Sequence, residues 1–122
     1  MLEETMSETE DLDGEWTSEV GSRLALTVAP DGSVRGKYWR AVDSATETEV
    51  FPLVGLRTGR VLSLTAHLWK HQSVMSLVGH YTEENGWPMI KAVWMLAKNV
   101  SDQENPPNLG SSILTGYNHF VR

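Results

Sequence analysis

The 122-residue chain has no cysteine, which excludes a disulfide framework, a thiolate zinc site and a cysteine nucleophile. Basic residues are also scarce, because ten Lys and Arg stand against sixteen Asp and Glu and give a net charge of −6. Binding to nucleic acid needs a basic surface that neutralises phosphates, so we expect no nucleic-acid partner. No apolar run approaches the roughly 18 residues of a membrane span, and we expect no membrane partner. The length allows a single domain.

The acidic residues concentrate at the N-terminus. Residues 1–19 hold eight acids and no base, whereas the rest of the chain has eight acids and ten bases. A segment this charged and this poor in apolar residues cannot build a core. We therefore predict a disordered acidic tail over residues 1–13 and one folded domain over residues 14–122. An acidic docking arm is the alternative for the tail.

The start of the chain also lacks the positive n-region and the apolar h-region of a signal peptide. The cytoplasm is the expected compartment for the sequence as written. The alternative is a secreted or periplasmic protein from which a signal has been removed.

Helical periodicity is missing too, and from residue 14 onward the apolar residues recur with a period of two. Turn signals interrupt this alternation at Pro30-Asp31-Gly32-Ser33 and at Glu83-Glu84-Asn85-Gly86. The pattern predicts eight short strands, over residues 14–19, 23–28, 34–40, 50–57, 60–70, 73–81, 87–97 and 111–121. A meander of this size closes on itself to remove its edges. The predicted fold class is therefore all-β, an eight-stranded antiparallel up-and-down β-barrel with room inside for one small ligand.

Two late strands are apolar on both faces. In strand 60–70 the series Leu62, Leu64, Ala66 and Leu68 lies opposite Trp69, and in strand 87–97 the series Trp87, Met89, Val93 and Met95 lies opposite Ile90, Ala92, Trp94 and Leu96. An exposed apolar area of this extent usually marks an interface. We predict a homo-oligomer, a dimer or a tetramer, that packs through the outer faces of these two strands.

Four segments resemble the avidin/streptavidin family, in the family's order and at nearly its spacing, over residues 14–121. They are Gly14-Glu15-Trp16 with Gly21-Ser22, Gly36-Lys37-Tyr38, Leu68-Trp69-Lys70 with Val93-Trp94-Met95-Leu96, and Leu114-Thr115-Gly116-Tyr117-Asn118-His119-Phe120. The resemblance implies a barrel that binds biotin without chemistry and without a cofactor. The Gly-x-Trp opening also occurs in lipocalins, so a lipocalin-like carrier of another apolar ligand is one alternative. An interaction barrel that has lost biotin binding is another.

The resemblance also implies a binding site. The hydroxyls of Ser22 and Tyr38 can donate to the carbonyl of a cyclic urea, and Asn118 can accept from one of its N–H groups. Trp69 and Trp94 would sandwich the apolar rings. The full predicted set comprises Ser18, Val20, Ser22, Tyr38, Arg40, Val42, Trp69, Ser73, Met75, Leu77, Trp94, Leu96 and Asn118. Of the remaining tryptophans, Trp16 is predicted to face inward, and Trp39 and Trp87 outward.

Several positions depart from the family pattern. Arg40 stands where most members have a small acceptor for the second urea N–H, and a guanidinium can only donate. Ser18 replaces a longer amide, Met75 a threonine and Leu77 a tryptophan, while Gly110 replaces a tryptophan that tetrameric members send into a neighbouring subunit. Weaker binding is therefore expected. Three roles for Arg40 stay open: contact with a ligand carboxylate, filling of the pocket, or a head group placed at the rim.

Neither a metal site nor catalysis is expected. His67 and His71 share a strand face, but no third ligand lies near them in sequence. The chain has no Gly-x-Ser-x-Gly nucleophile elbow.

Overall fold

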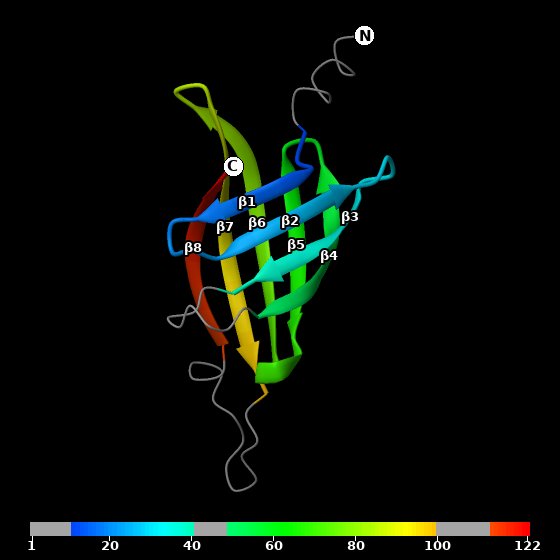
Figure 1. Ribbon diagram of the computed structural model, residues 1–122, viewed down its shortest axis with the longest axis vertical. Helices are drawn as coiled ribbons and strands as arrows, with labels where there is room; N and C mark the ends of the chain where they lie inside the picture. The colour runs from blue at the N-terminus through cyan, green and yellow to red at the C-terminus, as the bar shows by residue number, and fades with distance from the viewer. Residues whose placement is uncertain (1–10, 41–48, 100–112) are drawn as a thin grey trace, which may run out of the picture.

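The computed structural model describes residues 11–40, 49–99 and 113–122. In these residues it has eight strands: β1 (Gly14–Ser18), β2 (Arg23–Val28), β3 (Ser33–Trp39), β4 (Val50–Thr58), β5 (Val61–Leu68), β6 (Ser73–Glu84), β7 (Trp87–Lys98) and β8 (Ile113–Val121). The strands pair in chain order, each antiparallel to the next, and β8 pairs with β1 to close the barrel (Figure 1). The predicted fold class is confirmed. No helix in the described residues is long and apolar enough to cross a membrane.

The connection between β5 and β6 differs from the prediction. Residues Trp69–His71 form a single 3₁₀ turn, η1, where the sequence predicted a strand that continues to residue 70. Leu68 pairs with Ser73, so only four residues are left to reverse the chain. Gln72 completes the reversal with a left-handed backbone, φ 49°. Extended conformation at residue 69 is incompatible with a reversal this short.

The hairpin between β6 and β7 is tighter than predicted. Pairing continues to Glu84 and Trp87, which leaves Asn85-Gly86 as a two-residue turn. Both turn residues have positive φ, 54° and 82°, as the Asn-Gly preference of type I′ hairpins requires. Both strands reach 12 residues, and the tip of the hairpin stands clear of the barrel end in Figure 1.

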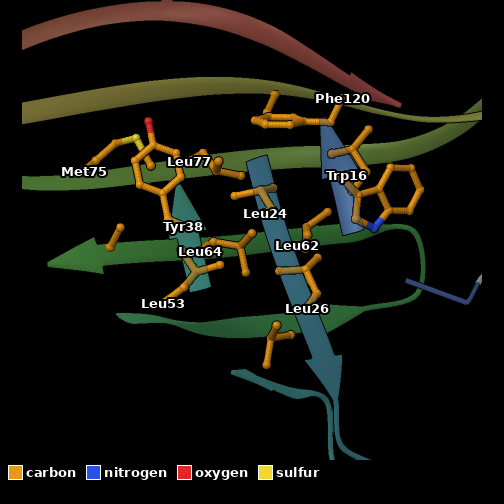
Figure 2. Close-up of a cluster of buried hydrophobic side chains, with 14 of the residues drawn as sticks. Trp16, Leu24, Leu26, Tyr38, Leu53, Leu62, Leu64, Met75, Leu77 and Phe120 are labelled. Carbon is orange, nitrogen blue, oxygen red and sulfur yellow. The ribbon is translucent and has the colours of Figure 1, made fainter. Parts of the chain in front are cut away.

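The interior of the barrel is filled by alternate residues of all eight strands, and Figure 2 shows part of this buried cluster. The predicted face of strand 60–70 is wrong, because Leu62, Leu64, Ala66 and Leu68 point into the core and are buried. The prediction treated Trp69 as part of the strand, but Trp69 belongs to η1 and lies outside the strand alternation. In β7 the assignment is correct: the series that starts at Ile90 faces inward.

One end of the barrel is sealed. The indole of Trp16 is fully buried and donates from Nε1 to the carbonyl of Leu12 at 3.0 Å. Tyr81 packs edge-on against it at 6.4 Å between ring centroids, and the Arg122 guanidinium carbon lies 4.2 Å from its ring centroid. Figure 2 shows Trp16 and Phe120 at one end of the buried cluster and Tyr38 at the other. Within the described residues, the cavity beside Tyr38 at the other end of the barrel is therefore the candidate place for a ligand.

Residues 11–13 belong to the folded domain. Leu12 is fully buried, and the Asp13 carboxylate accepts a hydrogen bond from the Val28 N–H at 2.8 Å. The predicted boundary after residue 13 is therefore too late, and the remainder of the predicted tail, residues 1–10, lies outside the described residues. The high charge of residues 1–13 led to the prediction of a disordered tail, although this segment contains Leu12, whose side chain caps the sealed end.

Truncation of this cap tests its contribution. We expect Leu12→Ala to lower the free energy of unfolding by about 2–5 kcal/mol, because it opens a cavity beside Trp16. Urea denaturation followed by tryptophan fluorescence measures the change. Val20→Ala, which trims a valine that is 61% exposed, serves as the control with a change within about 0.5 kcal/mol. Unaltered stability of Leu12→Ala would show that residues 11–13 do not hold the barrel closed.

Candidate ligand-binding site

A cavity of about 300 Å³ lies at the open end of the barrel, and we call it the inner chamber. Its lining residues are Val20, Ser22, Tyr38, Arg40, Leu68, Met75, Trp94, Leu96 and Asn118. Apolar walls with a few converging polar groups are typical of a small-molecule site. Of the predicted set, the structure brings together Val20, Ser22, Tyr38, Arg40, Met75, Trp94, Leu96 and Asn118.

Two serines at the β1–β2 turn form a polar corner of the inner chamber. Ser18 Oγ accepts hydrogen bonds from the N–H groups of Ser22 and Val20, at 3.1 and 3.3 Å. With both acceptor positions occupied, Ser18 donates its own proton to Ser22 Oγ, 2.6 Å away. The hydroxyl proton of Ser22 can thus be donated to the Tyr38 oxygen or to an acceptor on a ligand. Ser18, predicted as a direct contact, lies behind this corner and orients Ser22.

Tyr38 supplies the second donor. Its side chain is largely buried, and burial raises the pKa of the phenol above its ordinary value, an effect that the nearby Arg40 charge and the hydrogen bond with Ser22 partly oppose. The hydroxyl therefore stays protonated at neutral pH and can donate to an acceptor in the chamber.

The indole of Trp94 forms one wall of the inner chamber and packs on Gly116 of β8, its direct cross-strand partner. A Cβ atom at position 116 would come within 2.6 Å of Trp94 Cζ2. Only glycine leaves room for the ring in this orientation.

Trp69 lies apart from the other predicted contacts. Its side chain is 53% exposed, and it packs edge-on against Phe51 at 6.3 Å between ring centroids. Because η1 removes it from the strand, Trp69 does not line the inner chamber. Of the two tryptophans predicted to sandwich the ligand, Trp94 lines the chamber and Trp69 does not. Leu77 is buried in the core, outside the chamber lining. Val42 and Gly110 lie outside the described residues.

A second cavity, of about 260 Å³, adjoins the first, and we call it the outer chamber. It is lined by Arg40, Leu68, His71, Ser73, Leu96 and Lys98. Arg40, Leu68 and Leu96 line both chambers. Leu68, His71 and Lys98 are site residues that were not predicted from the sequence. Leu68 is in one of the segments that resembles the family, but no sequence signal marked His71 or Lys98.

Arg40, Glu49 and His71 meet at the rim. Arg40 Nη1 lies 3.1 Å from Glu49 Oε1 and 2.8 Å from His71 Nε2, and His71 Nε2 lies 2.9 Å from the same carboxylate oxygen. The hydrogen bond from His71, followed by the one from Arg40, holds the pKa of Glu49 below its ordinary value. Of the three roles left open for Arg40, the structure shows the head group at the rim, 42% exposed and ion-paired.

The Nε2 atom of His71 donates to Glu49 when it carries a proton. When it carries none, it accepts from Arg40, which can only donate. In the part of the chain that the structure describes, no group of three His, Cys, Asp or Glu side chains could hold a metal ion.

A closed eight-stranded barrel, sealed at one end and holding an apolar cavity with converging hydroxyls at the other, is a β-barrel with a candidate small-molecule site. The avidin family model matches residues 6–122. The chain belongs to the avidin family, whose members are non-enzymatic biotin-binding proteins. The match decides between the avidin-like and the lipocalin-like interpretation in favour of the former.

Solved structures of avidin-like proteins share the fold. Xenavidin superposes with a TM-score of 0.78 at 23% identity, over 92% of this chain and 97% of that chain. Short afifavidin in complex with biotin superposes with a TM-score of 0.74 at 23% identity, over 96% of this chain and 95% of that chain. Rhizavidin in complex with biotin superposes with a TM-score of 0.73 at 20% identity, over 88% of this chain and 96% of that chain. No curated protein sequence matches the chain significantly.

Substitution of Gly116 tests the position of Trp94. We expect Gly116→Ala to displace the indole, because the new methyl group and the ring would overlap. The displaced ring should change the tryptophan emission spectrum and weaken ligand binding, while far-ultraviolet circular dichroism stays that of a β-barrel. A variant with unaltered emission and unaltered ligand affinity would contradict the packing of Trp94 on Gly116.

Proposed function

We propose that this protein binds biotin in the inner chamber, with lower affinity than family members that retain the complete set of contacts. The observation that carries the proposal is the convergence of the hydroxyls of Ser22 and Tyr38 with Asn118 and Trp94 in one chamber. The biotin complexes of rhizavidin and short afifavidin, which share this fold, support it.

The chemistry of the chamber matches a cyclic urea. The urea carbonyl accepts hydrogen bonds from the hydroxyls of Ser22 and Tyr38, and one urea N–H donates to the amide oxygen of Asn118. The apolar rings pack against Trp94, Met75 and Leu96. The Ser18 hydrogen bond holds Ser22 and burial restricts the Tyr38 side chain, so the ligand has less ordering to impose on these two residues.

The lower affinity follows from what the chamber lacks. Arg40 offers only donors and is engaged by Glu49 and His71, so within the described lining residues only Asn118 is placed to accept from a urea N–H. The N–H left unpaired costs about 1–3 kcal/mol, or one to two orders of magnitude in affinity. The absence of the Trp69 ring from the chamber removes one apolar wall as well.

Calorimetric titration with biotin tests the proposal. We expect saturable one-site binding, and we expect Tyr38→Phe to weaken it by about one to two orders of magnitude through loss of one donor. Tyr81→Phe is the matched control, because it removes the same hydroxyl at the sealed end of the barrel, where that hydroxyl donates to Glu83. Absence of heat at millimolar biotin would refute biotin binding.

We further propose that the barrel assembles into a homo-oligomer through the outer faces of β6, β7 and β8. Val78, Val93 and Tyr117 are direct cross-strand neighbours there, and they are 63%, 49% and 80% exposed. They line a surface groove of about 500 Å³. The outer face of β5 contributes less than the sequence predicted, since its leucines point inward. Apolar area of this extent favours burial against a second copy of the chain.

Sedimentation velocity at micromolar concentration tests the assembly. We expect a dimer or a tetramer for the native chain and a shift towards monomer for Val93→Arg, because a guanidinium in an apolar contact loses its hydration without a partner. Thr27→Arg, an equivalent charge on the exposed face of β2, should leave the oligomer unchanged. A native chain that sediments as a monomer would overturn the proposal.

A further inference from the structure

We propose that the outer chamber selects ligands that carry a free carboxylate, so that the protein binds free biotin in preference to biotin whose carboxyl group is condensed into an amide. The inference rests on the proposed function and assigns a specificity to the chamber beside the proposed urea site. Its residues are Arg40, His71 and Lys98.

The outer chamber is basic. Three of its six lining side chains are Arg40, His71 and Lys98, and none of the lining residues is acidic. Glu49, at the rim, already uses Oε1 to pair with Arg40 and His71. Lys98 forms no ion pair with a described residue. The one carboxylate offsets one of two permanent positive charges, and a positive charge remains even when His71 is neutral.

The position of this charge fits the tail of a ligand whose rings occupy the inner chamber. Arg40, Leu68 and Leu96 line both chambers, so the two leucines form an apolar neck between the urea site and the basic group. The polar urea site, the apolar neck and the basic group follow one another in the same order as the cyclic urea, the apolar chain and the acid of such a ligand. Its chain would contact the leucines, and its carboxylate would lie among the basic side chains.

The chamber discriminates because two of its hydrogen-bond donors, Arg40 and Lys98, are cationic. Ser73, which the sequence predicted to meet the ligand's tail, donates its hydroxyl proton to the His71 carbonyl at 2.9 Å. The remaining side-chain donors are those of Arg40, His71 and Lys98. A carboxylate forms charge-assisted hydrogen bonds with such donors. A neutral amide also displaces the water that hydrates these donors, but it forms weaker hydrogen bonds with them than a carboxylate does.

The test compares biotin with its primary carboxamide, which has the same size and no charge. We expect the native protein to bind biotin at least about tenfold more tightly than the amide in low-salt buffer at neutral pH, the equivalent of one charge-assisted hydrogen bond. In Lys98→Gln the affinity for biotin should fall, and the preference over the amide should shrink to within about threefold. Lys37→Gln, the same change on the exposed outer face of β3, should keep the preference.

The outcomes separate the two proposals. Equal affinities of the native protein for biotin and for its amide would overturn the carboxylate selectivity and leave biotin binding standing. A preference that survives unchanged in both Lys98→Gln and Arg40→Gln would also overturn it, because the discrimination would then arise elsewhere. Absence of binding by both compounds would overturn the proposed function and this inference together.

Discussion

The pairing of β8 with β1 closes the sheet, and every other property of this molecule depends on that closure. Thr17 pairs with Val121, and Ser18 pairs with Phe120. An open meander of eight strands would leave two edges with unpaired backbone groups, whereas the closed barrel pairs each strand on both sides. Closure also defines an inside, and the short stretch of pairing that achieves it ends at the serine that orients Ser22. The seam of the barrel is therefore also the support of the candidate site.

The two ends of the barrel are built differently. At one end Trp16, Leu12 and Arg122 pack into a seal made of buried apolar surface and one stacked cation. At the other end the described residues leave two cavities, and the rim is held by the ion pair of Arg40 with Glu49 and by the hydrogen bond between His71 and the same carboxylate. A seal of packed side chains stabilises the fold, while a polar rim leaves a cavity accessible. In the described residues, this asymmetry places the candidate ligand site at the end opposite the seal.

Much of the candidate site could be predicted from the sequence. Strand alternation places Tyr38, Trp94 and Asn118 on the inner face, and Ser22 joins them from the β1–β2 turn. Each of the four lies in a segment that resembles the family. Local rules were sufficient wherever a residue sits inside a regular strand. They failed at β5, where the reversal through η1 took Trp69 out of the alternation, so the predicted inner and outer faces of that strand were exchanged.

The sequence by itself determined the barrel, its strand order and the inward side chains of most strands, since a period of two and turn signals are local properties of the chain. The tertiary structure alone decided that Leu12 caps the sealed end, that Trp69 lies outside the chamber, and that Arg40 pairs with Glu49 and His71. These contacts depend on where turns and strand ends meet. Arg40 and His71 lie 31 positions apart, and only the closed barrel brings two such distant residues to the same rim.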